Sequence, residues 1–113
     1  MAAGNELRAE AQRSLAFGAT GANYVAIGTP MAHPINIFIV QNLTDAAMQF
    51  SFDGIVDHFV LPANGMWVSD NVTNRQETNT AFFLGKGTSF YVKRIGTPTT
   101  GSLYVTVLYA RGA

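Results

Sequence analysis

Residues 48–64, MQFSFDGIVDHFVLPAN, constrain the fold of this chain more than any other segment. Apolar and polar residues alternate up to Asp53 and Gly54, and apolar residues return after this pair as far as Leu61. Alternation with a period of two is typical of a strand with one buried face, and Asp-Gly tolerates the positive φ angles of tight hairpin turns. The segment therefore predicts a β-hairpin in which Asp53 and Gly54 are the structural turn residues.

The same pattern of short apolar runs between turn residues continues along the chain. These runs predict strands at residues 23–27, 35–42, 47–53, 57–61, 66–70, 81–84, 88–95 and 102–109. Residues 85–87 predict a tight turn with Gly87 as a structural turn residue, and the polar residues 71–80 predict an exposed loop. About eight strands at such short spacing favour an all-β fold, a single small antiparallel β-sandwich or jelly roll, with a small barrel as the alternative.

Three of the expected strands supply the predicted core. Residues 35–42, INIFIVQN, are apolar at consecutive positions, which suggests burial on both faces of that strand. In residues 47–53 and 102–109 the large apolar residues alternate, so they share one face of each strand. We expect the core to be filled by Ile37, Ile39, Phe50, Phe52, Val105 and Val107.

Residues 5–15 are the best helix candidate, because a capping asparagine and a glutamate stand at the start of an apolar stripe that includes Leu7 and Leu15. The stripe is narrow and rich in alanine, so such a helix needs a partner surface. We predict an N-terminal arm or short helix at residues 1–17, followed by a β-sandwich domain at residues 18–113. An extended or frayed arm is the alternative.

Composition indicates that part of the surface is buried against other chains. Charged residues make up 12% of the chain, compared with about 25% in an average soluble domain, whereas 48% of residues are hydrophobic. A small monomer with so few charges would be prone to association. We therefore expect an obligate assembly, with Leu7, Leu15 and Trp67 as possible interface residues.

Bulk properties also disfavour several kinds of partner. A formal net charge of zero gives no basic surface for nucleic acid. No segment reaches the roughly 18 consecutive apolar residues of a membrane span, and the N-terminus lacks the pattern of a secretory signal. The chain has no cysteine, so disulfides and thiolate metal sites are excluded and packing alone must hold one domain of 113 residues.

Few residues could carry chemistry. Asp53, Asp57 and His58 lie close together in the sequence, but each has a simpler role at a turn or strand end. Structural calcium at Asp53, Asp57 and Asp70 is an alternative, although the spacing fits no EF-hand loop. Residues 85–88, GKGT, lack the full phosphate-loop pattern. We therefore expect no enzyme activity, no cofactor and no metal site.

Three stretches carry a family resemblance: SLAFGATGANYVAIGTP, HPINIFIVQNLTDAAMQFSFDGIVDHFVLPANG and FFLGKGTSFYVKRIGTPTTGSLYVTVLY. Turns at residues 42–45, 51–54 and 86–88 and strands at residues 57–62, 91–93 and 101–109 make up the match. Together they resemble small β-rich structural proteins of tailed bacteriophages and prophages, of the head decoration, neck or tail type. The resemblance covers nearly the whole chain after about residue 15.

This resemblance implies a non-enzymatic virion protein that is assembled in the cytoplasm of a host bacterium. Its expected partners are further copies of itself, in a homo-oligomer, and other virion proteins such as the major capsid protein or neck and tail proteins. We expect a capsid cement or decoration protein that stabilises the particle through contacts between subunits. A neck or tail component, or a carbohydrate-binding module for host adhesion that stacks sugars on residues such as Trp67, is the alternative.

Overall fold

The computed structural model describes residues 6–70 and 85–111. Strands dominate these residues, and a short 3-10 helix is the one helical element among them. In chain order the elements are β1 (Glu6–Ala9), β2 (Arg13–Ala16), η1 (Phe17–Ala19), β3 (Val25–Ala26), β4 (Ile37–Asn42), β5 (Met48–Ser51), β6 (Phe59–Leu61), β7 (Met66–Asp70), β8 (Tyr91–Arg94) and β9 (Ser102–Arg111). The strand predicted at residues 81–84 and the loop predicted at residues 71–80 lie outside the described residues.

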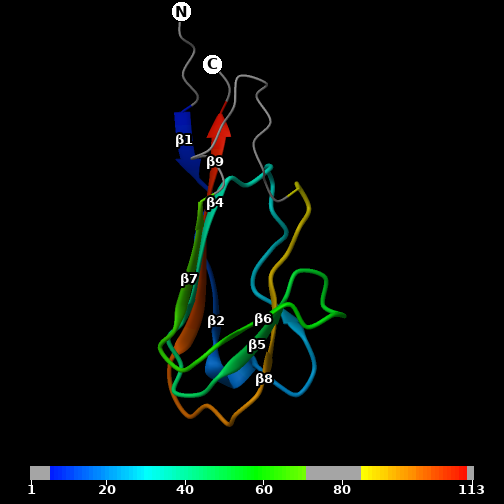
Figure 1. Cartoon of the computed structure of the whole chain (residues 1–113), viewed down its shortest axis with the longest axis vertical. Helices are drawn as coiled ribbons and strands as arrows, with labels where there is room; N and C mark the ends of the chain where they lie inside the picture. Colours follow the sequence, from blue (N-terminus) through cyan, green and yellow to red (C-terminus); the bar gives the residue numbers. More distant parts are fainter. Residues whose placement is uncertain (1–5, 71–84, 112–113) are drawn as a thin grey trace, which may run out of the picture.

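The strands form two antiparallel sheets that face each other (Figure 1). Sheet A has the order β1-β9-β4-β7. β2 also pairs with β9, at residues 102–105, whereas β1 pairs with residues 108–111. Sheet B has the order β3-β8-β5-β6. The all-β prediction of a small antiparallel β-sandwich is therefore confirmed. No helix in the described part of the chain has the length and apolar character needed to cross a bilayer.

The core lies between the two sheets and is made of alternate residues from each strand. Phe50, Val105 and Val107 have no exposed surface, and Phe52 is partly buried against the same cluster. The cluster of buried residues consists of Ile27, Met31, Ile35, Phe38, Val40, Met48, Phe50, Leu61, Phe90, Val92, Leu103, Val105 and Val107. Every second position of β4, β5 and β9 thus points inward, as a pleated strand requires.

The structure corrects the prediction for Ile37 and Ile39. Phe38 and Val40 are the residues of β4 that enter the core, so Ile37 and Ile39 lie on the opposite face, where they are half-buried. In a run of consecutive apolar residues the pattern does not say which alternate set points inward, and a shift of one residue exchanges the faces. The prediction selected the wrong set of β4 residues for the core.

The helix expected at residues 5–15 is also wrong, because this segment forms β1 and β2 on the edge of β9. The register joins Ala9 to Leu108 and Leu15 to Leu103. A lone helix with a thin apolar stripe is marginal. The edge of β9 instead supplies backbone partners, and Leu15 packs against the core. The N-terminal segment is therefore extended and belongs to sheet A.

The turn residues occupy positions that favour glycine. Gly54 has φ 76° and Gly87 has φ 92°, both in the left-handed region that residues with a Cβ atom rarely adopt. Gly54 lies in the connection between β5 and β6, which pair as an antiparallel hairpin. This connection runs from residue 52 to residue 58, so it is wider than a two-residue turn.

A buried asparagine ties the end of β4 to the end of β6. The Nδ2 atom of Asn42 donates to the carbonyl oxygens of Ala46 (2.9 Å) and Leu61 (3.2 Å), and its Oδ1 atom accepts from the amide of Thr44 (3.1 Å). Asn42 has no exposed surface, so these bonds offset the cost of burying its amide. This network anchors sheet B to the end of sheet A at one end of the sandwich.

Candidate functional site

The outer face of sheet A, which points away from sheet B, is the candidate interaction surface. The register places on this face the residues that alternate with the buried ones. Those with described side chains are Ala9, Ser14, Ala16, Ile37, Ile39, Gln41, Met66, Val68, Ser102, Tyr104, Thr106 and Leu108. None of these side chains carries a charge. The register also places Asp70 on this face, opposite Ile37, and its side chain lies outside what the structure describes.

Apolar side chains lie opposite one another at two positions of this face. Ile39 lies opposite Val68 on β7, and Ile37 lies opposite Leu108 on β9. Met66 and Val68 are 60% and 52% exposed. Covering apolar surface of this kind is favourable by about 25 cal/mol per Å², and exposed patches of this type mark interaction sites on soluble proteins. The part of this face around Ile39, Met66 and Val68 can therefore bind another apolar protein surface.

The outer face of sheet B has a different character. Nζ of Lys93 lies 3.2 Å from the carboxylate of Asp57 and 4.7 Å from the ring centre of Tyr24. The Tyr24 hydroxyl donates to Asp57, and the hydrogen bonds from Tyr24 and then Lys93 lower the pKa of that carboxyl. Burial and the neighbouring Asp57 raise the pKa of Tyr24. Charge is thus present on sheet B's side of the sandwich and absent from the described side chains of sheet A's outer face.

Trp67 lies at the open side of the core between β6 and β7 rather than on the outer face. Its ring meets Phe38 at 5.0 Å and Phe59 at 4.6 Å in edge-to-face contacts. Its 37% exposure shows that it closes this side of the sandwich while staying accessible. Of the other residues expected at an interface, Leu15 packs on the core, and the side chain of Leu7 lies outside what the structure describes. A role for these three residues at an interface stays a prediction.

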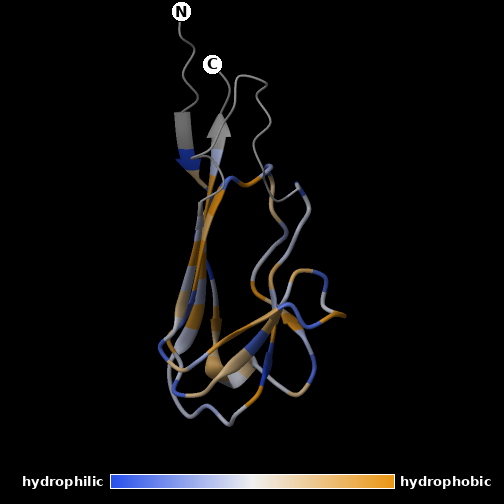
Figure 2. Ribbon diagram, in the orientation of Figure 1, coloured by the Kyte–Doolittle hydropathy of each residue, from blue (hydrophilic) through white to orange (hydrophobic). Residues whose placement is uncertain are grey.

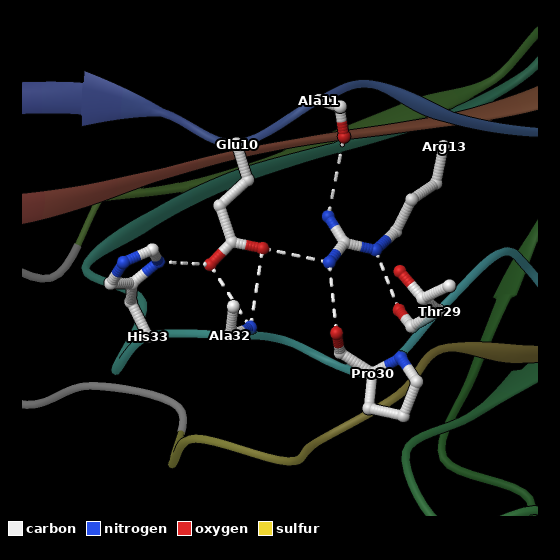
Figure 3. A network of polar contacts seen from close by, with 7 residues as sticks. All are labelled: Glu10, Ala11, Arg13, Thr29, Pro30, Ala32 and His33. Atoms are coloured by element: carbon white, nitrogen blue, oxygen red, sulfur yellow. Dashed lines mark hydrogen bonds and ion pairs between the residues drawn. The ribbon is translucent and has the colours of Figure 1, made fainter.

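A buried carboxylate fastens the link between β1 and β2 to the loop before β4 (Figure 3). The Glu10 carboxylate lies 2.7 Å from Nη2 of Arg13 and 2.7 Å from Nδ1 of His33, and it accepts from the amide of Ala32 at 3.1 Å. Burial by itself would raise the pKa of Glu10, but the bonds from Arg13, His33 and Ala32 outweigh it and lower the pKa. The His33 ring in turn stacks on Tyr109 of β9 at 3.7 Å.

Arg13 completes this network from the inner side of β2. Its Nε atom donates to the carbonyl oxygen of Thr29 (2.7 Å), and its Nη2 atom donates to that of Pro30 (3.0 Å). Only 7% of each side chain in the Glu10–Arg13 pair is exposed. All of these partners lie within the chain, so the network holds the N-terminal strands in place rather than offering a reactive group.

Sequence reasoning did not find this network. Glu10 and Arg13 are three residues apart, which is also the spacing of an ion pair on a helix, so their spacing favours the wrong local structure. His33 is far from both along the chain. Its proline neighbours mark a break in strand structure but give no sign of a partner.

The cluster of Ser51, Asp53 and His58 builds a turn and has no catalytic geometry. The Ser51 hydroxyl donates to Oδ1 of Asp53 at 2.8 Å, and Nδ1 of His58 accepts the backbone N–H of Phe52 at 3.0 Å. Nδ1 of His58 lies 3.4 Å from Oγ of Ser51 but already accepts the amide of Phe52, and Oγ itself accepts the amides of Asp53 and Gly54, so these groups are engaged in the turn. Ser51 also has no exposed surface.

Of the three acidic residues considered for calcium, Asp53 and Asp57 are similarly occupied, and the side chain of Asp70 lies outside what the structure describes. Asp53 accepts from the amides of Ile55 and Val56, which together with Ser51 lower its pKa to about 2, and Asp57 is bound to Tyr24 and Lys93. Across residues 6–70 and 85–111, no group of three or more metal-ligating side chains is arranged to hold an ion.

Comparison with known proteins gives a likeness in fold. No protein-family model and no curated protein matches the sequence. A chain of the cyanophage Pam1 capsid asymmetric unit has a TM-score of 0.55 and 12% identity, with 96% of this chain and 86% of that chain covered. This likeness supports a shared β-sandwich fold over almost the full length.

Two further structures are more distant. A chain of the disulfide-linked pili formed by Bacillus endospore appendages has a TM-score of 0.44 and 11% identity, covering 95% of this chain and 90% of that one. The Dit protein of phage SPP1, from a hub adsorption apparatus, has a TM-score of 0.40 and 10% identity, covering 91% and 49% respectively. At these scores neither likeness carries an argument about function.

Proposed function

We propose that this chain is a non-enzymatic structural protein of a tailed-phage virion, and specifically a capsid cement or decoration protein. The observation that carries the proposal is the outer face of sheet A, where the apolar residues Ile39, Met66 and Val68 lie on the neighbouring strands β4 and β7 and Met66 and Val68 are more than half exposed. The fold that the chain shares with a chain of the cyanophage capsid adds support. The described part of the chain also contains no reactive cluster that the fold leaves free.

The mechanism follows from the shape and the surface. The molecule measures 52 × 23 × 21 Å, so it is long enough to lie across the boundary between adjacent coat subunits. Burial of the apolar part of the outer face of sheet A against a neighbouring virion protein, whether a coat subunit or a second copy of the chain, would add apolar contact area. The buried Asn42 and Glu10 networks hold the sandwich together when force acts on this face. Such a clamp raises the cost of separating coat subunits.

Trp67 fits this structural role better than it fits a sugar-binding role. A sugar platform needs an exposed aromatic face. The Trp67 ring is instead held edge-to-face by Phe38 and Phe59, and its exposed fraction is 37%. Its position at the side of the core is typical of an aromatic residue that closes a sandwich and extends an interface.

The test is to purify particles from cells that produce the chain and to measure its copy number by quantitative mass spectrometry. A cement role predicts a copy number comparable to that of the coat protein, and particles assembled without the chain should release DNA at a lower temperature. A few copies per particle with unchanged heads would place the chain in the neck or tail. Absence of the chain from purified particles would refute the proposed function.

A further inference from the structure

The connection between β5 and β6 presents a second apolar feature, which we call the apex and define as residues 53–57. We propose that copies of this chain associate head to tail, with the apex of one copy packed on the outer face of sheet A of the next. The inference deepens the proposed function, because it names one partner as a second copy of the chain. It concerns the isolated chain, so its test does not depend on where the chain lies in a particle.

The apex is held rigidly by its own hydrogen bonds. Oδ1 of Asp53 accepts from the amides of Ile55 (2.9 Å) and Val56 (3.0 Å), and Oγ of Ser51 accepts from the amide of Gly54 (2.9 Å). Gly54 takes the positive φ of 76° that this path needs. A loop that is already ordered loses little conformational entropy on binding, so its side chains are suited to contact a partner.

This rigid turn holds two apolar side chains out in the solvent. Ile55 is 82% exposed and Val56 is 54% exposed, and Ile55 is the most exposed of the large hydrophobic side chains in the described part of the chain. The adjacent charge of Asp57 is already matched by Lys93 at 3.2 Å. The other carboxylate of the apex, Asp53, is hydrogen-bonded to the amides of Ile55 and Val56, so the apex presents two apolar side chains between two carboxylates that are already bonded within the chain.

The apex and the outer face of sheet A lie on opposite sides of the molecule. In Figure 1 the loop between β5 and β6 projects to the right, beyond sheet B, whereas β4 and β7 of sheet A lie to the left. Figure 2 shows hydrophobic colour at the tip of that loop and along the strands of sheet A. One copy cannot bring these two surfaces together, but two copies can, and repetition of such a contact gives a ring or a row.

The chemistry of the two surfaces matches. The face that would receive Ile55 and Val56 has Met66 and Val68 as its exposed apolar residues and no charge on its described side chains. Sheet B's side carries the Lys93–Asp57 pair, so it would force that pair to lose water if it received an apolar apex. Among the described surfaces, the outer face of sheet A is therefore the favoured receptor for the apex.

The test uses two single variants of the full chain and their mixture. Ile55→Asp disables the apex and leaves the face intact, whereas Val68→Asp disables the face and leaves the apex intact. Met66→Lys is a second face variant in case Val68→Asp disturbs β7. Ile95→Asp is the matched control, because Ile95 is an apolar residue outside both surfaces whose exposed fraction, 55%, is close to the 52% of Val68. Circular dichroism and thermal melting verify that each variant is folded.

Light scattering coupled to size exclusion gives the mass at a series of concentrations. The parent and Ile95→Asp should grow beyond a monomer as concentration rises, and each apex or face variant alone should remain monomeric. An equal mixture of Ile55→Asp and Val68→Asp should form dimers and nothing larger, because one intact apex and one intact face remain between them. A mixture that stops at dimers is expected for a head-to-tail contact and not for a symmetric contact between two identical faces.

Three results would overturn the inference. They are a parent chain that stays monomeric at all concentrations, an Ile55→Asp variant that assembles like the parent, and a mixture of folded variants that stays monomeric. An apex variant that assembles normally beside a monomeric face variant would indicate a symmetric face-to-face pair instead. The proposed function fails on a different result, the absence of the chain from purified particles, so the two failures can be told apart.

Discussion

Replacement of Glu10 by alanine should destabilise the fold strongly although Glu10 lies near the N-terminus. Its carboxylate is 7% exposed and bonds to Arg13, His33 and the amide of Ala32. Removing one partner of a buried ion pair costs about 3–5 kcal/mol, because the other charge stays buried without its partner. Arg13 keeps its bonds to the Thr29 and Pro30 carbonyl oxygens, so we expect about 3 kcal/mol, the lower end of this range.

Urea unfolding followed by Trp67 fluorescence measures this loss. Glu10→Gln is the conservative variant and should lose less, because an amide oxygen can still accept from Ala32. Asp57→Ala is the matched control. It removes an ion pair with an exposed carboxylate, and such pairs contribute little to stability. A Glu10→Ala variant that loses less than about 1 kcal/mol, the upper range for an exposed pair, would refute the claim that this network fastens β1 and β2.

Three further predictions concern glycine, acid and the core. Gly101 has φ 98° and its Cβ would lie 2.0 Å from the carbonyl oxygen of Leu43, whereas Gly87 has φ 92° and open space. Gly87→Ala should therefore cost about 1–2 kcal/mol and Gly101→Ala more than about 4 kcal/mol in denaturant unfolding; equal costs would contradict the steric argument. The pKa of Asp53 falls from 3.8 to about 2 on folding, so its contribution is present above pH 3.8 and lost as pH falls toward 2. Asp53→Asn should make the free energy of unfolding depend less on pH across that interval, and a variant with the same pH dependence as the parent would contradict this prediction. Phe50→Ala should cost about 3–5 kcal/mol in the same unfolding assay, because the ring has no exposed surface, and a cost below about 1 kcal/mol would mean that Phe50 does not fill the core.

Local patterns predicted the strands after the N-terminal segment well, because the alternation of a strand involves residues that are consecutive in the sequence. The predicted strand at residues 66–70 matches β7, and that at residues 102–109 lies within β9. The choice of face in β4 was different, since Ile37 and Phe38 are both large and apolar. Only the register with β7 and β9 decides that Phe38 enters the core.

The N-terminal segment shows why non-local contacts are harder to predict. Its alanine-rich stripe fits a helix when read alone, yet β9, at the far end of the chain, offers an open edge that pairs with it. The Glu10 network joins residues 23 positions apart, Glu10 and His33, and stacks His33 on Tyr109. Composition gave the general expectation of an interface, but the register was needed to propose one face of sheet A for it.

Oxidation of methionine in free and particle-bound chain tests the central claim most directly. Met66 is 60% exposed on the outer face of sheet A, whereas Met31 is 2% exposed and serves as an internal reference. Hydroxyl-radical footprinting with mass spectrometry gives the oxidation rate of each. The structural role predicts that Met66 reacts rapidly in free chain that has been diluted until it is monomeric and is protected in purified particles, while Met31 reacts slowly in both. Equal reactivity of Met66 in the two states would contradict the claim that this face binds neighbouring virion proteins.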